Sequence, residues 1–170
     1  VGPGGQGEGR SFASLLSASP VDGPAGVTPE SVCLMLYTSG TTGRPKGVVH
    51  THASLIAGGA NTALAHRLTQ DDRGLCVLPL YHINALCVSL MGTLVSGGSL
   101  VMPPKFSVSG FWSTIRQNCC TWFSVVPTQI SYLLNEAEAD GHDSTGLDAL
   151  RFGRSASAAL SPDVQQAFES

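Results

Sequence analysis

Charged residues are scarce in this chain of 170 residues. Asp, Glu, Lys and Arg make up 12% of it, whereas hydrophobic residues make up 42%. An average soluble domain has about 25% charged residues. We therefore expect part of the surface to be covered by protein outside these residues, and the absence of an initiating Met fits a segment of a longer chain. The net charge of −3, with no block of like charges, argues against binding to nucleic acid or to an anionic membrane surface.

The chain also lacks a long apolar run, since none approaches the roughly 18 residues that a membrane span needs. Its first residues have neither the basic start nor the apolar stretch of a secretory signal. The five cysteines form no C-x-x-C pair and no Cys/His spacing of a zinc site, so no metal-binding residue is predicted. Four of the five cysteines lie in apolar runs and are expected to be buried, which favours a reduced, cytoplasmic setting.

Two regions of different composition follow one another. Residues 1–30 are rich in Gly, Pro, Ser and Ala and are predicted to form a connector. From residue 31 onwards, apolar runs alternate with segments of helical spacing, which predicts an α/β fold whose mostly parallel sheet is flanked by helices. The first run, Val32–Tyr37, is continuous and is expected to form a strand buried on both faces. The predicted strands cover residues 32–37, 47–50, 75–78, 99–102, 121–126 and 150–153, and the predicted helices cover 52–66, 83–96, 109–118, 127–139 and 162 onwards.

A loop rich in hydroxyl groups and glycine follows the first predicted strand. Hydroxyls and free backbone N–H groups donate to anionic oxygens, and Lys46 adds a cation suited to phosphate. A Walker A loop would place Gly-Lys-Ser/Thr at the start of a helix, whereas here Lys46 lies between Pro45 and Gly47 and precedes a strand. The loop is therefore predicted to form the tip of a β-hairpin that binds phosphate, with a plain polar turn as the alternative. The candidate binding residues are Thr38, Ser39, Gly40, Thr41, Thr42, Gly43 and Lys46.

Residues Tyr37–Val48 resemble the signature loop of the adenylate-forming superfamily, which includes acyl-CoA synthetases, firefly luciferase and nonribosomal adenylation domains. The resemblance continues to about residue 170 and begins near residue 28. It implies that residues 31–170 are a partial nucleotide- and acyl-binding α/β subdomain of the superfamily's large N-terminal domain. The other motifs that carry it are Pro79-Leu-Tyr-His82, Gly97–Phe106, Val126-Pro127-Thr128 and Leu150–Leu160.

The resemblance implies ATP-dependent activation of a carboxylic acid through an acyl-adenylate, followed by thioester formation with coenzyme A. ATP, Mg²⁺ and coenzyme A are then the expected cofactors. His82 is the catalytic candidate, because in this motif it would orient the incoming carboxylate. A packed structural histidine is the alternative reading. Ser157 and Ala158 are expected to lie near the adenine.

The chain departs from the family pattern at two places. Ala85 stands where the family often has Gly, and its methyl group is expected to narrow the acid pocket. Ala156 and Ala159 replace a Gly and a Pro, so the adenine loop cannot use a glycine with positive φ. The family's remaining adenine, ribose and C-terminal catalytic motifs are not among these residues. We therefore expect residues 1–170 alone not to catalyse adenylation.

Several functions stay open from the sequence. The leading one is an acyl-CoA synthetase for a fatty or aryl acid, which the apolar run Ile83–Val95 favours. A related enzyme would load a carrier protein, and a different class would be a non-catalytic nucleotide-binding module. The expected partners are a small carboxylic acid, ATP, coenzyme A and the remainder of the same chain. A P-loop NTPase is disfavoured by the missing Gly-Lys-Ser/Thr.

Overall fold

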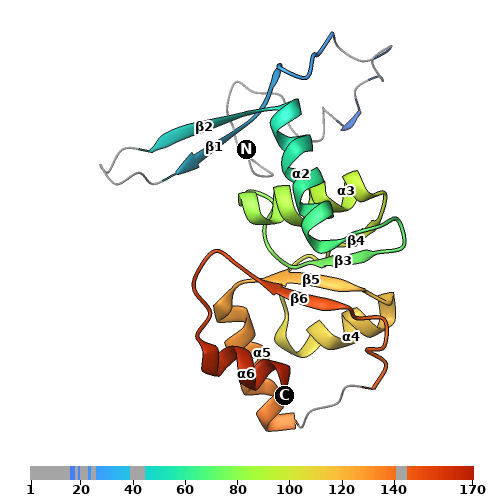
Figure 1. Cartoon of the computed structure of the whole chain (residues 1–170), viewed down its shortest axis with the longest axis vertical. Coiled ribbons are helices and arrows are strands. Elements are labelled where there is room, and N and C mark those ends of the chain that lie inside the picture. The colour runs from blue at the N-terminus through green and yellow to red at the C-terminus, as the bar shows by residue number, and fades with distance from the viewer. Residues whose placement is uncertain (1–15, 18, 20–22, 24–25, 39–44, 141–144) are drawn as a thin grey trace.

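The computed structural model describes residues 16–17, 19, 23, 26–38, 45–140 and 145–170. Its elements, in chain order, are β1 (Val32–Thr38), β2 (Lys46–Thr51), α2 (His52–His66), β3 (Arg73–Cys76), the π-helix η1 (Asn84–Met91), α3 (Gly92–Ser96), β4 (Ser99–Val101), α4 (Val108–Asn118), β5 (Trp122–Val125), α5 (Pro127–Asp140), β6 (Phe152–Ser155) and α6 (Pro162–Glu169). A two-stranded hairpin projects from a body whose sheet is covered by helices on both faces (Figure 1). Helices α2 and α3 lie on one side of this sheet, and α4, α5 and α6 lie on the other.

The four-stranded sheet has the order β4-β3-β5-β6, and all neighbouring strands are parallel, which confirms the predicted fold class. Two strands are shifted by two residues from the predicted ranges: β3 covers Arg73–Cys76 and β6 covers Phe152–Ser155. Backbone pairing around Thr121 explains the earlier start of β3. The N–H of Thr121 donates to the carbonyl of Arg73 (2.7 Å), and the N–H of Arg151 donates to the carbonyl of Thr121 (2.7 Å). Strand β3 thus begins at the polar Arg73, and β6 extends through Arg154 and Ser155, which a search for apolar runs does not include.

Strands β1 and β2 form an antiparallel hairpin in which Thr38 lies opposite Lys46, so the predicted hairpin is confirmed. The prediction that Val32–Tyr37 is buried on both faces is wrong. Val32, Met35 and Tyr37 are 63%, 50% and 72% exposed. The cause is that β1 belongs to a separate two-stranded ribbon, which extends away from the four-stranded sheet (Figure 1).

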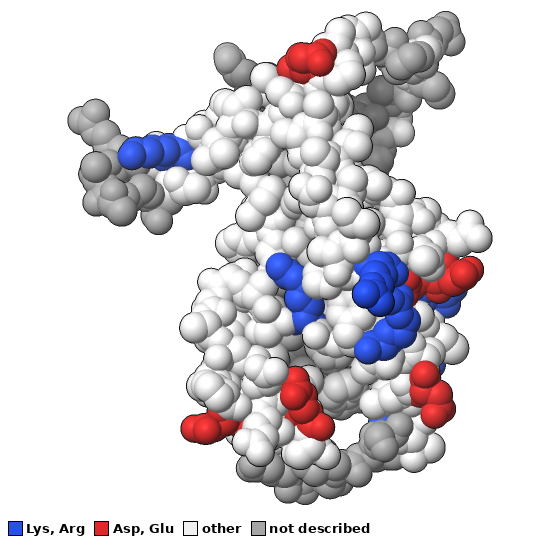
Figure 2. Space-filling view, viewed as in Figure 1, with Lys and Arg blue, Asp and Glu red and all other residues white. Residues whose placement is uncertain are grey.

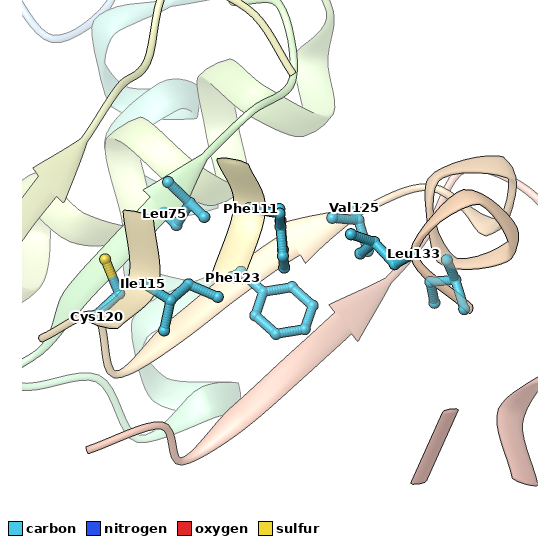
Figure 3. Close-up of a cluster of buried hydrophobic side chains, with 8 residues drawn as sticks. Leu75, Phe111, Ile115, Cys120, Phe123, Val125 and Leu133 are labelled. Atoms are coloured by element: carbon cyan, nitrogen blue, oxygen red, sulfur yellow. The ribbon is translucent and has the colours of Figure 1, made fainter. Parts of the chain in front are cut away.

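One face of the sheet carries the main hydrophobic core (Figure 3). The ring of Phe123 on β5 meets the ring of Phe111 on α4 edge to face, with centroids 5.1 Å apart. Both rings are fully buried, and such a pair adds stability beyond the area it buries. The buried residues of this cluster are Leu75, Phe111, Ile115, Cys120, Phe123, Val125, Ile130 and Leu133.

The cysteines are all free thiols. Cys76 and Cys120 are buried and Cys87 is half-buried, and burial raises the pKa of each of these three thiols. Cys33 and Cys119 are exposed, so the prediction that four cysteines are buried is wrong. Cys33 is exposed because it lies on the projecting hairpin, and Cys119 because it caps the end of α4 with φ 50°.

Among the helices of the described residues, none combines the length and the apolar character that crossing a membrane requires.

Helix α2 packs closely on η1 through two glycines. A Cβ on Gly58 would lie 2.4 Å from the sulfur of Cys87, and a Cβ on Gly59 would lie 2.7 Å from the carbonyl oxygen of Met91. The segment predicted as one helix over 83–96 is helical but divides into η1 and α3, which ends at Gly97 with φ 77°. The glycine contact fixes the position of η1, and η1 carries residues of the candidate site at its first turn.

Asp72 links the beginnings of three strands. It is 3% exposed and accepts hydrogen bonds from the N–H of Thr69 (2.8 Å) and the hydroxyl of Thr121 (2.7 Å). The guanidinium of Arg151, just before β6, forms an ion pair with the same carboxylate. Desolvation alone would raise the pKa of Asp72, but the hydrogen bonds from Thr121, Arg151 and Thr69 outweigh it, so the pKa lies below its ordinary value.

The change Gly59→Ala tests the contact between α2 and η1. An added methyl group must displace the backbone at Met91, and overpacking of this kind costs about 1–3 kcal/mol. Better helix propensity returns about 1 kcal/mol, so the net loss of unfolding free energy is expected to be up to about 2 kcal/mol. Urea denaturation of the full-length protein measures it. The control is Asn61→Ala at an exposed position of α2, which should not destabilise, and a stabilised Gly59→Ala variant would contradict the packing described here.

The change Asp72→Asn tests the link at the strand beginnings. Removing the charge while leaving three donors in place is expected to lower the unfolding free energy by about 1.5–3 kcal/mol at pH 7. Because the folded-state pKa is depressed, this stabilisation is complete above the unfolded pKa of about 4 and is lost as the pH falls through the folded pKa. Urea denaturation from pH 7 down to pH 3 should therefore show the wild type and the variant converging. An equal difference at both pH values would argue against this role of Asp72.

Candidate functional site

The candidate site lies where β3, β5 and β6 end, the edge at which parallel α/β sheets bind ligands. After β3, the chain turns at Pro79, where its carbonyl accepts a hydrogen bond from the N–H of His82 (3.0 Å). The carbonyl of His82 accepts from the N–H of Leu86 (3.1 Å), which joins this turn to η1. The ring of His82 lies 4.6 Å from that of Tyr81 and is exposed, so it is accessible to a ligand.

Four polar residues form a hydrogen-bonded group at this edge, which we call the Arg154 cluster: Asn84, Ser124, Arg154 and Ser157. Nη1 of Arg154 donates to Oδ1 of Asn84 (2.9 Å) and to the hydroxyl of Ser124 (3.1 Å). Nδ2 of Asn84 donates to the hydroxyl of Ser157 (3.1 Å). The cluster therefore connects the start of η1 with β5, β6 and the loop after β6.

Arg154 places a positive charge at this edge. Its side chain is half-buried, and desolvation lowers its pKa, but a guanidinium stays charged in proteins. Within the described residues, no carboxylate forms an ion pair with it. Its hydrogen-bond partners in the cluster are neutral oxygens of Asn84 and Ser124, which orient the guanidinium without cancelling its charge. A half-buried cation held in this way is a favourable position for an anion.

Ser157 adopts the left-handed backbone conformation, with φ 74°. The prediction that this loop lacks a glycine with positive φ holds, and the structure shows that a serine takes that conformation instead. A side chain in this region costs about 1–2 kcal/mol. The hydrogen bond from Asn84 holds Ser157 in place, and both Ser157 and the following Ala158 are exposed at the site.

The phosphate-binding candidates lie mainly outside the described residues. Of these candidates, the structure describes Thr38 and Lys46, which face each other at the ends of β1 and β2, and it does not describe Ser39–Gly43. The side chain of Lys46 is exposed, and Figure 2 shows a basic side chain near the outer end of the hairpin. The hairpin is a separate two-stranded sheet that projects from the body of the molecule (Figure 1).

The structure brings two of the predicted site residues to one edge and adds two residues that the sequence analysis did not name. His82 and Ser157 come to one edge through Asn84, which lies two residues after His82 and bonds to Ser157. Asn84 and Arg154 were not candidates from the sequence. A signal for Arg154 was present, because this arginine directly follows the predicted strand 150–153. Ala85 is fully buried beside Asn84, so its methyl group points into the protein and the expected narrowing of the acid pocket stays untested.

The described residues offer no metal centre of their own. No group of three His, Cys, Asp or Glu side chains among them lies close enough together to hold an ion. The candidate site is instead a guanidinium that donates to neutral oxygens of Asn84 and Ser124 and keeps its positive charge, which suits an anionic organic ligand.

Comparisons with known proteins show which family this chain resembles. A family model described as AMP-binding enzyme matches residues 6–170. Sulfoacetate–CoA ligase of Cupriavidus necator is 50% identical over 153 residues, which are 90% of this chain and 28% of that protein. Oxalate–CoA ligase of Arabidopsis thaliana is 36% identical over 143 residues, which are 83% of this chain and 27% of that protein.

A solved structure shows the same fold. ATP-bound MatB from Rhodopseudomonas palustris is 28% identical and superposes with a TM-score of 0.76 over 92% of this chain and 30% of that chain. The chain therefore spans less than a third of each of these relatives. Because the family model covers nearly the whole chain and the fold agrees, the resemblance to adenylate-forming enzymes is confirmed, and this chain belongs to the family of AMP-binding enzymes.

Proposed function

We propose that this chain is the nucleotide- and acid-binding part of an AMP-forming acid–CoA ligase. The observation that carries the proposal is the 50% identity, over 90% of the chain, to an enzyme named sulfoacetate–CoA ligase. The site supports it, because His82 and the Arg154 cluster offer a cation and donors at the ligand-binding edge of the sheet.

In the first half-reaction, a carboxylate oxygen attacks the α-phosphorus of ATP. The bond from that phosphorus to the bridging oxygen breaks, and pyrophosphate leaves with the additional negative charge. The proposed role of Thr38–Gly43 and Lys46 is to hold the leaving phosphates, because hydroxyls, backbone N–H groups and a cation stabilise charge that develops there.

His82 is proposed to orient the carboxylate before the attack. Its ring is exposed at the edge of the sheet, and the hydrogen bonds of its backbone to Pro79 and Leu86 hold it at the start of η1. Positioning two anions that would otherwise repel each other is the main task of such a site. Ser157 and Ala158 are proposed to border the adenine, since both are exposed in the loop beside this edge.

In the second half-reaction, the thiol of coenzyme A attacks the acyl carbon, its proton is lost, and AMP leaves. Coenzyme A is preferred to a carrier protein as the acceptor because both sequence relatives described above are named CoA ligases. Mg²⁺ would accompany the triphosphate and share its charge. No residue of the described part is assigned to this ion, since no suitable group of ligands lies there.

The two sequence relatives also indicate which class of acid the enzyme activates. Sulfoacetate and oxalate are short acids that carry a second anionic group, and these are the acids named for the two sequence relatives. They favour a short, doubly anionic acid over the fatty or aryl acid that the apolar run Ile83–Val95 suggests. In the structure, that run packs against α2 through the glycine contact, so its apolar character has a structural explanation.

The acceptor is tested with the full-length protein. Incubation with ATP, a panel of acids and either coenzyme A or a phosphopantetheine-loaded carrier protein is expected to give acyl-CoA and AMP, detected by mass spectrometry. Transfer only to the carrier protein would identify a loading enzyme instead. ATP binding with no AMP formed for any acid would favour a non-catalytic nucleotide-binding module.

The change Lys46→Ala tests the phosphate role of the hairpin. Loss of one well-placed donor to the leaving phosphates is expected to reduce kcat for ATP–pyrophosphate exchange by about 100-fold. Lys105→Ala is the matched control, because it removes another exposed lysine from a turn away from the hairpin. If Lys46→Ala left both the exchange rate and the KM for ATP unchanged, Lys46 would have no part in phosphate binding.

A further inference from the structure

We infer that the Arg154 cluster binds the second anionic group of the acid substrate and thereby selects short acids with two anionic groups. The inference rests on the proposed function and goes beyond it, because it names the residues that select the acid. The three side chains that would meet the anion are Arg154, Asn84 and Ser157. They come from β6, from the first turn of η1 and from the loop after β6.

The charge of Arg154 is the first step of the argument. Another arginine of the same segment, Arg151, forms an ion pair with the buried carboxylate of Asp72. Arg154 has no such partner among the described residues, although its side chain is half-buried and desolvated. A cation that is withdrawn from water without a counterion is costly, and a bound anion removes that cost.

The orientation of the guanidinium is the second step. Arg154 uses Nη1 for both Asn84 (2.9 Å) and Ser124 (3.1 Å), and no hydrogen bond within the described residues uses its Nη2 or Nε. A guanidinium presents its donors as a flat fork that matches the two oxygens of a carboxylate or a sulfonate. The two hydrogen bonds of Nη1 fix the plane of the fork and leave the other donors for a ligand.

The position of the cluster relative to His82 is the third step. Asn84 follows His82 by two residues at the junction of the turn and η1, so the proposed position of the reacting carboxylate and the cluster share one short segment. This closeness in the chain favours a short substrate. Ser157 keeps a strained backbone with φ 74° at this point, and its hydroxyl is fixed by Asn84. Strain retained at a polar, exposed position is typical of ligand sites.

The alternative occupant of the cluster is a phosphate of ATP, which offers similar oxygens. A phosphate bound there would make Arg154 a nucleotide-binding residue with no effect on the choice of acid. The apolar tail of a fatty acid would find a charged, hydrogen-bonded group, and its burial against an unpaired cation would be unfavourable. The structure therefore favours an anion over an apolar tail in the cluster. Kinetic measurements separate the second anionic group of the acid from a phosphate of ATP.

The test measures kcat/KM of the full-length protein for pairs of acids of similar length, by ATP–pyrophosphate exchange. Sulfoacetate is paired with propionate and oxalate with acetate, and KM for ATP is measured in parallel. The wild type should prefer the doubly anionic member of at least one pair. Arg154→Met should reduce that preference by about 10- to 100-fold through a raised KM for the doubly anionic acid, since charge-assisted hydrogen bonds are lost. KM for the doubly anionic acid should rise more than KM for the singly charged acid and more than KM for ATP.

A second variant tests the cluster independently, in case Arg154→Met does not fold. Asn84→Asp keeps the shape of the side chain and places a carboxylate 2.9 Å from Nη1 of Arg154, where it supplies an internal counterion. The Ser157 hydroxyl can donate to this carboxylate in place of accepting from the amide. The variant is expected to lose the preference for the doubly anionic acid while its melting temperature is maintained. Lys105→Met, which removes an exposed positive charge elsewhere, is expected to keep the wild-type preference.

Several results would overturn the inference. One is a wild-type enzyme that activates both members of each pair equally well or prefers the singly charged acid. Another is an Arg154→Met variant whose raised KM concerns ATP alone, which would assign the cluster to a phosphate. If no acid supports exchange, the proposed function itself fails. Calorimetric titration of sulfoacetate into the wild type and Asn84→Asp then still decides the binding claim, since equal affinity, or no binding, would refute it.

Discussion

The parallel register of β3, β5 and β6 determines where the polar groups of this chain lie. Strand β5 is central, with Ser124 paired to Cys76 on one side and to Arg154 on the other. This register brings the strand ends together at one edge and the strand beginnings together at the other. One arginine from the segment of β6 lies at each of these edges, and the groups that surround the two arginines differ. The structural and the ligand-binding properties of the chain follow from that difference.

The alternation of side chains along β5 separates the core from the site. Phe123 and Val125 are buried in the cluster with α4 and α5, whereas the hydroxyl of Ser124 on the other face accepts a hydrogen bond from Arg154. A shift of one residue would bring Ser124 into the hydrophobic core and leave Phe123 beside a guanidinium. Both changes are costly, so the core that stabilises the sheet also holds the cluster in place.

Much of the fold could be predicted from the sequence, because it depends on local patterns. The alternation of apolar runs and helical segments gave the parallel sheet, and the range of α2 agrees with the prediction. The burial of Val32–Tyr37 could not be judged, since an apolar run does not tell whether another layer covers it. Arg154 and Asn84 are separated by 70 residues in the chain, and only the register of β6 beside β5 brings them together. His82 and Ser157 could be named from motifs, but their relation through Asn84 needed three-dimensional structure.

The two arginines near β6 show why one edge of the sheet supports the fold and the other suits a ligand. Arg151 meets a carboxylate that already accepts from Thr121 and from the backbone of Thr69, so its charge is neutralised within the chain. Arg154 meets an amide and a hydroxyl, which satisfy one nitrogen and leave the charge in place. An internal carboxylate at Asn84 would stabilise the folded chain more, because it would neutralise a half-buried cation. The amide instead keeps the guanidinium oriented and its charge available, an arrangement that gains stability only when an anion binds.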